Sequence, residues 1–369
     1  MIGSMPLNAP ELEGRISAAL QAVESRLMTV VSSADETINP PTSHLAAAGG
    51  KRLRPVLTLL TAQLGDPALA TGEQVRDAGV AVELTHIATL YHDDVMDDAP
   101  LRRGAPSAQT VWGNSAAILT GDVLVARASQ LVAALGPQAV LAHAKTFERL
   151  CMGQLHETLP VPVGVDRVEH YIQVLADKTG SLIAVSARYG VMLTGAGARA
   201  EAVVEAFGEK IGVAFQLADD VIDLTSDSAT TGKTPGTDLR EGVDTMPVLL
   251  LRRALAAGEL DAEGQSILST LSSTNLSSDE ALAEVVARLR EHPVLERTRR
   301  MAMRWAEEAV TVLAGLEDAA VAGAVERLDA QGVTDATERE AALADTRERA
   351  ALVRAAMEQF AHLLVDRAA

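Results

Sequence analysis

At residues 92–98 the chain reads His-Asp-Asp-Val-Met-Asp-Asp, and at residues 219–223 it reads Asp-Asp-Val-Ile-Asp. Each Asp-Asp-x-x-Asp motif ends a long apolar run with helical spacing. On a helix the first and fifth positions face the same way, so Asp93 and Asp97 share a face, and the second motif repeats this. One such turn is more often a solvated surface. Two copies favour binding of a hard cation such as Mg²⁺, which prefers oxygen ligands.

The composition predicts a single all-α domain that spans residues 1–369. Hydrophobic residues make up 48% of the chain and aromatic residues only 2%, which favours helices packed through small side chains. Residues 1–8 are expected to fray. Residues 324–350 are expected to form an exposed charged excursion before a terminal helix at residues 355–367.

The charge and cysteine content restrict the environment and the partners. A net charge of −18 argues against nucleic acid and against electrostatic attachment to anionic lipid. A single cysteine, Cys151, excludes an internal disulfide and fits a reducing cytosol. We find neither a signal peptide nor a run of roughly 18 apolar residues that could span a bilayer. We therefore expect a cytoplasmic protein with no stable membrane insertion.

Basic and flexible residues accompany the acidic motifs. Before the first motif lies a basic segment, Gly49-Gly50-Lys51-Arg52-Leu53-Arg54-Pro55. This segment could cradle an anion, although a basic surface turn is the simpler interpretation. His86 lies two helical turns before the first motif and on its face. Arg102 and Arg103 follow the motif, where salt bridges to its aspartates explain one arginine more easily than two. Gly180 should kink its helix and direct Lys178 and Thr179 into a cavity.

Two carboxylate clusters and separate sets of cations indicate a substrate with concentrated negative charge, and two diphosphates fit best. A diphosphate bridged by metal to the aspartates would become a leaving group. A second diphosphate, near Lys51, Arg54 and His86, would be held by side chains and would not leave. Ionisation of an allylic diphosphate followed by attack of an alkene has these requirements.

With these motifs in place, the sequence resembles the trans-isoprenyl diphosphate synthases, or polyprenyl synthetases, over roughly residues 45–315. The resemblance rests on five motifs in family order. They are Gly-Gly-Lys-Arg-Leu-Arg-Pro at 49–55, His-Asp-Asp-Val-Met-Asp with Arg-Arg-Gly at 92–104, Lys-Thr-Gly-Ser at 178–181, Phe-Gln-Leu-Ala-Asp-Asp-Val-Ile-Asp at 215–223, and Gly-Lys with Gly-x-Asp-Leu at 232–239. The resemblance implies a homodimeric helical bundle of the isoprenoid synthase type with a central substrate cavity.

The resemblance also assigns site residues. It implies that isopentenyl diphosphate is held by Lys51, Arg54, His86 and Arg103. Three Mg²⁺ per active site on the allylic diphosphate would be bound by Asp93, Asp97 and Asp219, with support from Asp94, Asp98, Asp220 and Asp223. The allylic site would be completed by Arg102, Lys178, Thr179, Gln216 and Lys233. The residues expected to act in catalysis are Asp93, Asp97, Lys178, Asp219 and Lys233.

The helix before the first motif bears on product length. Short-chain members of the family commonly carry a large aromatic residue five positions before the first aspartate, and this chain has Ala88 there. Thr89, Thr85 and Ala81 follow on the same side and are also small, which predicts a deep tunnel and a long-chain all-trans product of about C35–C50. Val243 departs from the family, because many members have lysine at that position.

Three other functions would share part of this pattern. A short-chain farnesyl or geranylgeranyl diphosphate synthase shares every motif but the small tunnel residues. A non-catalytic subunit of a heteromeric synthase would have eroded aspartate motifs, and both motifs are intact here. A terpene cyclase would replace one motif and lose the isopentenyl cradle. The sequence therefore favours a polyprenyl diphosphate synthase, a transferase of prenyl groups.

Overall fold

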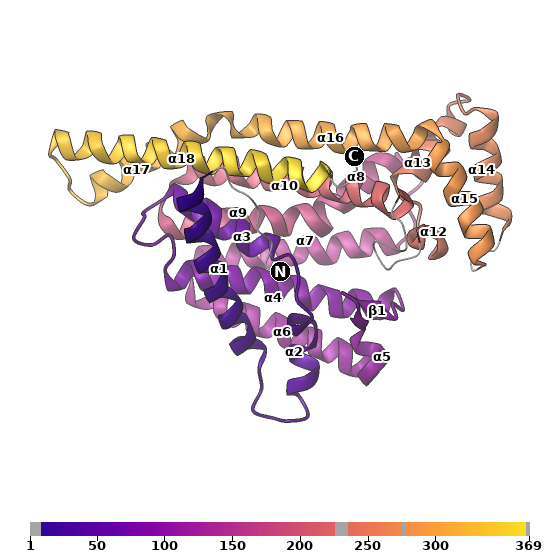
Figure 1. Ribbon diagram of the computed structural model, residues 1–369, viewed down its shortest axis with the longest axis horizontal. Coiled ribbons are helices and arrows are strands. Elements are labelled where there is room, and N and C mark those ends of the chain that lie inside the picture. The colour runs from indigo at the N-terminus through magenta and orange to yellow at the C-terminus, as the bar shows by residue number, and fades with distance from the viewer. Residues whose placement is uncertain (1–8, 226–234, 275, 277, 367–369) are drawn as a thin grey trace. The chain divides into compact units, whose positions relative to one another are not determined.

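A computed structural model describes residues 9–225, 235–274, 276 and 278–366, and its regular structure is almost entirely helical (Figure 1). The first helices are α1 (Pro10–Val31), α2 (Asn39–Ala47), α3 (Leu53–Thr61), η1 (Ala62–Leu64), α4 (Glu73–Met96), α5 (Ala108–Trp112), α6 (Asn114–Ala134) and α7 (Pro137–Thr158). A hairpin of two short strands, β1 (Leu101–Arg102) and β2 (Ala105–Pro106), separates α4 from α5.

The remaining elements are also helical. They are α8 (Arg167–Leu175), the π-helical turn η2 (Ala176–Gly180), α9 (Ser181–Thr194), α10 (Ala198–Thr225), α12 (Thr237–Arg240), α13 (Met246–Ala256), α14 (Ala262–Ser273), α15 (Asp279–Glu291), α16 (Pro293–Val312), η3 (Leu313–Gly315), α17 (Leu316–Ala330) and α18 (Ala336–Val365). The predicted all-α class is confirmed.

The chain divides into two compact units. The first comprises Met1–Glu148, Ser181–Gly208 and Val310–Phe360, and the second comprises Arg149–Gly180, Glu209–Ala309 and Ala361–Ala369. The assignment of residues 1–369 to a single domain therefore stays a prediction. The expected fraying of residues 1–8 lies outside the described residues.

Helix α4 lies at the centre of the first unit. It packs against α1, α3, α6 and α9, and most of its residues from Val75 to Tyr91 are buried. A helix surrounded in this way has no polar face, and its small residues let neighbouring helices approach closely. The pattern of apolar and small residues therefore anchors α4 in the core up to Asp94, which is buried, and leaves Asp97 and Asp98 exposed at its end.

Helices α3 and α9 cross at a very short distance. A Cβ atom on Gly190 of α9 would lie 2.3 Å from the carbonyl oxygen of Thr58 on α3, so only glycine fits there. At the same crossing, the Thr58 hydroxyl donates to the Ser186 carbonyl at 2.8 Å, and the Thr61 hydroxyl donates to the Ala187 carbonyl at 2.7 Å. The crossing fixes α3, and with it the basic segment that precedes α3.

Among the described residues, one helix has the length and composition of a membrane span, whereas we expected none. This helix is α6, whose most apolar window is 39% buried. The buried side of α6, which includes Thr120, Leu124 and Ala128, belongs to the core of the first unit. Asp122 and Arg127 interrupt the apolar sequence of α6, so the helix contains no uninterrupted apolar run of roughly 18 residues.

The predicted charged excursion at 324–350 is wrong in its boundaries, whereas most of its residues from 331 to 345 are exposed, as expected. The terminal helix α18 begins at Ala336, not near residue 355, and Ala324 lies within α17. Thr346 and Ala350 are buried on α18. Arg349 donates to the carbonyls of Gln63 at 2.6 Å and Gly65 at 3.0 Å, so a charged residue here satisfies backbone groups instead of facing water. The start of α18 escaped prediction because the buried positions in its first half are Thr346 and Ala350, which give little hydropathy signal.

Candidate active site

The first aspartate motif forms the carboxyl-terminal end of α4. The backbone N–H of Asp97 donates to the carbonyl of Asp93 at 2.8 Å, so the two residues stand one turn apart as predicted. Asp98 then adopts a left-handed conformation with φ of 49°, which ends the helix. The carboxyl end of a helix carries partial negative charge and disfavours carboxylates. A cluster of aspartates at this position therefore calls for a cation.

The hairpin after α4 brings one arginine back onto the motif. Its turn contains Arg103 and Gly104, which both have positive φ, as a tight hairpin turn requires. Arg102 Nε lies 2.5 Å from Oδ1 of Asp94, whose side chain is fully buried. Burial raises the pKa of Asp94, and the charge of Arg102 opposes that rise. Arg102 therefore forms the salt bridge to the motif that was the simpler interpretation of this pair of arginines. That interpretation accounts for Arg102 and leaves Arg103 to be explained.

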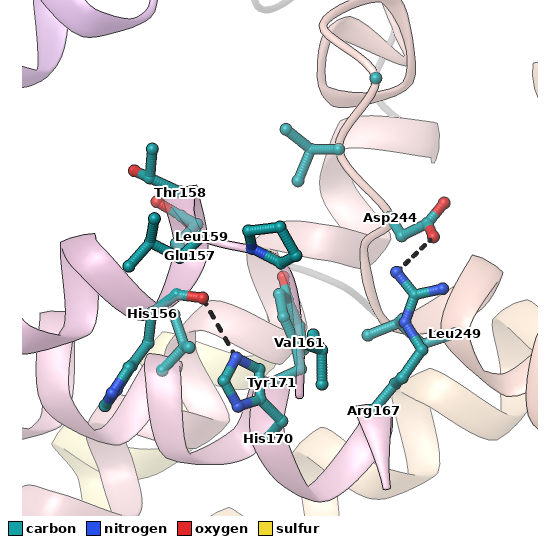
Figure 2. Close-up of a pocket in the computed structure, with 14 residues that line it drawn as sticks. His156, Glu157, Thr158, Leu159, Val161, Arg167, His170, Tyr171, Asp244 and Leu249 are labelled. Carbon is teal, nitrogen blue, oxygen red and sulfur yellow. Dashed lines mark hydrogen bonds and ion pairs between the residues drawn. The ribbon is translucent and has the colours of Figure 1, made fainter. Parts of the chain in front are cut away.

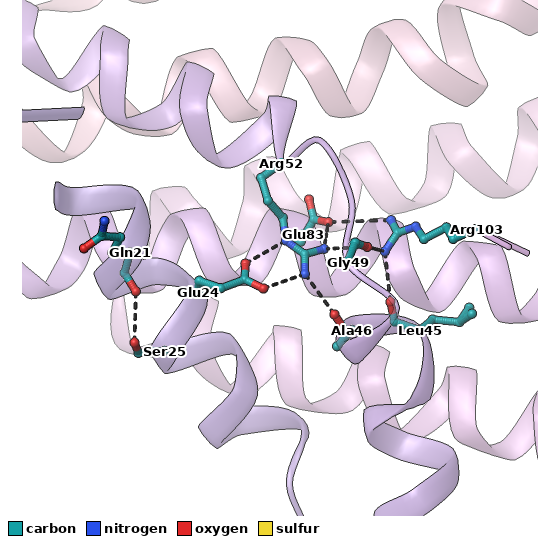
Figure 3. A network of polar contacts seen from close by, with 9 residues as sticks. All are labelled: Gln21, Glu24, Ser25, Leu45, Ala46, Gly49, Arg52, Glu83 and Arg103. Carbon is teal, nitrogen blue, oxygen red and sulfur yellow. Dashed lines mark hydrogen bonds and ion pairs between the residues drawn. The ribbon is translucent and has the colours of Figure 1, made fainter. Parts of the chain in front are cut away.

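A buried ion-pair network supports the basic segment before α3 (Figure 3). Arg52 has φ of 51° and is 4% exposed. Its guanidinium contacts Glu24 at 2.7 Å and Glu83 at 2.7 Å, and it donates to the Ala46 carbonyl at 3.0 Å. Arg103 donates to the Leu45 carbonyl at 2.9 Å and to the Gly49 carbonyl. These contacts hold the glycine-rich segment on α4.

Arg54 and His86 lie in the positive field of this network. Burial, together with the charge of Arg103, lowers the pKa of Arg54 to about 10, against the opposing effect of Glu83. Arg54 Nε is buried and has no hydrogen-bond partner among the described residues. Burial and the charges of Arg54, Arg103 and Arg102 hold the pKa of His86 well below its usual range. A charged guanidinium with a buried, unused donor is the kind of group that an anion would satisfy.

The second motif lies at the carboxyl-terminal end of α10, in the second unit. Asp219 and Asp223 are half-buried, whereas Asp220 is 5% exposed. The Tyr171 hydroxyl donates to both carboxylate oxygens of Asp220 at 3.1 Å, and the Met246 N–H donates to Oδ2 at 3.1 Å. Burial raises the pKa of Asp220 well above its usual value. Asp220 thus connects α10 to α8 and α13, while Asp219 remains accessible.

The helix containing Gly180 is interrupted by a π-helical turn, η2, where the sequence predicted a kink. A Cβ atom on Gly212 of α10 would lie 2.4 Å from Cα of Gly180, so two glycines let the turn pack against α10. Arg149 contacts Asp177 at 2.7 Å and also pairs with Glu209, which ties the turn to α7 and α10. Wide turns of this kind occur often at functional sites.

The η2 turn carries two of the predicted allylic-site residues. Lys178 is paired with Glu157, and Thr179 is 8% exposed. Gln216 is half-buried on α10, one turn before Asp219. Lys233 falls outside the described residues.

A pocket of about 320 Å³ opens next to these groups in the second unit (Figure 2). Its wall includes Glu157, which pairs with Lys178, and Tyr171, which donates to Asp220. Val243 and Asp244 also line it, and Arg167 approaches Asp244 at 3.3 Å. Val243, at the position where many family members have a lysine, thus presents an apolar side chain to the pocket.

The predicted tunnel residues lie along α4. Ala81 and Ala88 are fully buried, Thr85 is 1% exposed, and Thr89 is half-buried. The hydroxyl of Thr85 donates to the Ala81 carbonyl at 2.8 Å, and that of Thr89 donates to the His86 carbonyl at 2.9 Å. Because both hydroxyls are satisfied within the helix, this side of α4 presents methyl groups to its surroundings.

The structure groups the predicted residues by unit. The first unit contains Lys51, Arg54, His86, Asp93, Asp94, Asp97, Asp98, Arg102 and Arg103. The second contains Lys178, Thr179, Gln216, Asp219, Asp220 and Asp223. No group of three His, Cys, Asp or Glu side chains is gathered as a metal site within the described part of the chain. Of the aspartates predicted to bind metal, Asp93 and Asp97 belong to the first unit and Asp219 belongs to the second.

Sequence reasoning missed the residues that support the site. Arg52 belongs to the segment that could cradle an anion, but its guanidinium forms ion pairs with Glu24 and Glu83. Glu83 is the one carboxylate within the apolar run from Ala78 to Leu84, which is a signal for a buried cation. Arg149 and Tyr171 had no comparable signal, because their partners are distant in the sequence.

Comparison with known proteins defines the class. The sequence profile of the polyprenyl synthetase family matches residues 35–289. A nonaprenyl diphosphate synthase from Mycobacterium tuberculosis is 42% identical over 318 residues, which cover 86% of this chain and 92% of that relative. The chain therefore belongs to the polyprenyl synthetase family and is a prenyltransferase.

Solved structures agree with the fold. The geranylgeranyl pyrophosphate synthase from Corynebacterium glutamicum, complexed with calcium and isoprenyl diphosphate, matches with a TM-score of 0.76 and 36% identity, and the match covers 98% of each chain. A polyprenyl synthase from Caulobacter crescentus, complexed with the same ligands, matches with a TM-score of 0.78 and 25% identity over 100% of this chain and 99% of that one.

Proposed function

We propose that the protein condenses isopentenyl diphosphate with an allylic prenyl diphosphate in repeated 1'-4 additions to give a long-chain all-trans product. The observation that carries this proposal is the cationic cluster around Arg54. Its buried Nε has no hydrogen-bond partner among the described residues, and Arg103 and His86 lie within the same field. This cluster suits a diphosphate held by side chains alone.

The aspartate motifs suit a divalent metal, and Mg²⁺ is the ion we propose. Every group they offer is a carboxylate oxygen, the ligand type that hard cations prefer. Asp93, Asp97 and Asp219 would bind the ions, three per site by family resemblance. The relatives from Corynebacterium and Caulobacter were crystallised with calcium and isoprenyl diphosphate, which supports a divalent ion beside a diphosphate. When bound, the metal would neutralise charge that develops on the leaving diphosphate.

The protein's own groups would act on both substrates. The allylic diphosphate, whose C1–O bond breaks, would be held by Lys178, Thr179, Gln216 and Arg102. Isopentenyl diphosphate, whose C4 forms the new bond to C1, would be held by Lys51, Arg54, His86 and Arg103. Loss of a proton from C2 restores a double bond, and the released diphosphate accepts that proton. Lys178 is paired with Glu157 here, so binding would require it to exchange partners.

A long product is supported by the small residues on α4 and by the similarity to nonaprenyl diphosphate synthase. The similarity to a geranylgeranyl pyrophosphate synthase keeps a short-chain product as the second candidate. The two candidates differ at the position of Ala88, where a large side chain would close the tunnel.

We also propose that the enzyme is a cytoplasmic homodimer that pairs through the exposed side of α6. That side presents Ile118, Leu119 and Val123, which are 42%, 63% and 37% exposed. Asp122 is the charged residue on this side of α6, and its carboxylate lies 3.3 Å from His92. An exposed helix face so poor in charge is typical of an interface. Sedimentation equilibrium tests the dimer, and a monomer at micromolar concentration would contradict it.

Removal of the metal tests the reaction class. The purified enzyme, given isopentenyl diphosphate and farnesyl diphosphate, should elongate the primer with Mg²⁺ present. Chelation should abolish product formation, because the charge on the leaving diphosphate is then uncompensated. Activity should return when Mg²⁺ is restored. Elongation that persists after complete chelation would contradict the proposed role of the aspartates.

Arg54→Ala and Lys51→Ala should raise the KM for isopentenyl diphosphate more than the KM for the allylic substrate. Each lost charge-assisted contact is worth about 1.5–3 kcal/mol, or roughly a 10- to 100-fold effect. Arg15→Ala, a change at an exposed arginine of α1, serves as the control and should leave both constants unchanged. If the allylic KM rises instead, the two diphosphate sites are exchanged in our assignment.

A further inference from the structure

Four exposed arginines gather on one surface of the second unit. Arg297, Arg300 and Arg304 follow one face of α16 at intervals of three and four residues, and Arg253 comes from α13. Together with Val168 and Met301 they line an open hollow of about 660 Å³. We call these four residues the arginine face.

The arginine face contains no acidic residue, although the chain has 50 aspartates and glutamates against 32 lysines and arginines. Within the described residues, no hydrogen bond or ion pair engages any of the four guanidinium groups. Two nearby glutamates of α16 are already paired. Glu296 contacts Arg299 at 2.7 Å, and Glu308 contacts Lys210 at 2.7 Å. The four guanidinium groups thus lie together without an ion-pair partner in the described structure, although Glu307 follows Arg304 by one turn on α16.

We propose that the arginine face docks onto the anionic lipid headgroups of a membrane surface. All four side chains are exposed, so a broad array of phosphates can reach them together. A site for a single free phosphate would be expected to hold it with buried donors, and this hollow has none. Met303, which is 48% exposed, adjoins Arg304 and offers an apolar contact at the headgroup level.

The net charge of −18 argues against attachment of the whole protein to anionic lipid, but the local charge of a surface determines its attraction at short range. The Debye length is about 8 Å at physiological ionic strength, so distant carboxylates are screened while an adjacent cluster of arginines is not. Each basic residue close to an anionic bilayer contributes about a fivefold gain in binding. Docking would deliver a long prenyl product to the phase in which it dissolves. This role in product delivery rests on the proposed product length, whereas the docking itself does not.

The test is sedimentation of the full-length protein with vesicles, without substrate. Vesicles of phosphatidylcholine mixed with phosphatidylglycerol should bind the protein at about 0.1 M salt. Binding should fall at about 1 M salt, where the Debye length is roughly 3 Å. The variant Arg300→Glu/Arg304→Glu should lose at least about 25-fold in apparent affinity. Arg15→Glu/Arg199→Glu changes the net charge by the same amount at exposed sites elsewhere and should bind like wild type.

Circular dichroism and prenyl transfer in detergent establish that both variants are folded, and activity should be unchanged in both. Three results would overturn the proposal. They are equal binding to pure phosphatidylcholine vesicles, equal loss of binding in the two double variants, and binding of inorganic diphosphate at this face without any vesicle binding. Because no substrate is present, failure of docking and failure of the enzymatic assignment remain distinguishable.

Discussion

Asp93→Asn and Asp219→Asn are each expected to lower turnover by at least about 100-fold while the protein stays folded. A metal that neutralises the leaving diphosphate contributes several kcal/mol to transition-state stabilisation, and each 1.4 kcal/mol corresponds to a factor of ten in rate. Both residues lie near the carboxyl ends of long helices, where negative charge is unfavourable. Loss of a carboxylate there should leave the melting temperature unchanged or slightly higher.

The measurement is steady-state turnover at saturating Mg²⁺, together with thermal unfolding. Asp318→Asn is the matched control, because that side chain is 81% exposed on α17 and pairs only with Arg347 in the described structure. The control should behave like wild type. Near-normal turnover in either motif variant would refute the metal assignment of that motif.

Ala88→Tyr is expected to shorten the products to about three or four isoprene units. Ala88 is fully buried on α4, five residues before Asp93, so a phenol ring there would block a tunnel that runs along the helix away from the metal-binding end. One helical turn advances about 5.4 Å, roughly one extended isoprene unit. Ala81→Tyr, two turns further along, should therefore stop the chain about two units later than Ala88→Tyr.

The alternative explanation is that Ala88 only permits close helix packing. The substitution would then cost about 1–3 kcal/mol of stability through overpacking and would leave product length unchanged. Ala350→Tyr, at a fully buried position on α18, is the control for overpacking alone. It should reduce stability without shortening the products. Chromatography of the dephosphorylated products separates the two explanations, and an unshortened series from Ala88→Tyr excludes the tunnel.

Much of the helical framework could be predicted from the sequence because its signals are local. Apolar periodicity located α4 and α10, and both aspartate motifs lie at the ends of these helices as expected. Gly180 predicted an irregular turn, and a π-helical turn is found at that position. Such features depend on residues within one or two turns of each other.

Features that depend on distant partners could not be predicted. Arg52 reads as one more surface cation, yet it is buried because Glu24 and Glu83 converge on it from α1 and α4. The first half of α18 reads as a solvated segment because its inward positions include Thr346 and Ala350, which give little hydropathy signal. In both cases the charged residue acts through a contact that sequence spacing does not reveal.

The length of the wild-type product tests the central assignment most directly. The purified enzyme, with Mg²⁺, farnesyl diphosphate and excess isopentenyl diphosphate, should give all-trans products of about seven to ten isoprene units, identified by mass spectrometry after dephosphorylation. That range is the one that the family resemblance implies, and each turn of α4 left open by small residues adds about one unit to it. A product that stops at three or four units would contradict the long-chain assignment, and no condensation at all would contradict the assignment as a synthase.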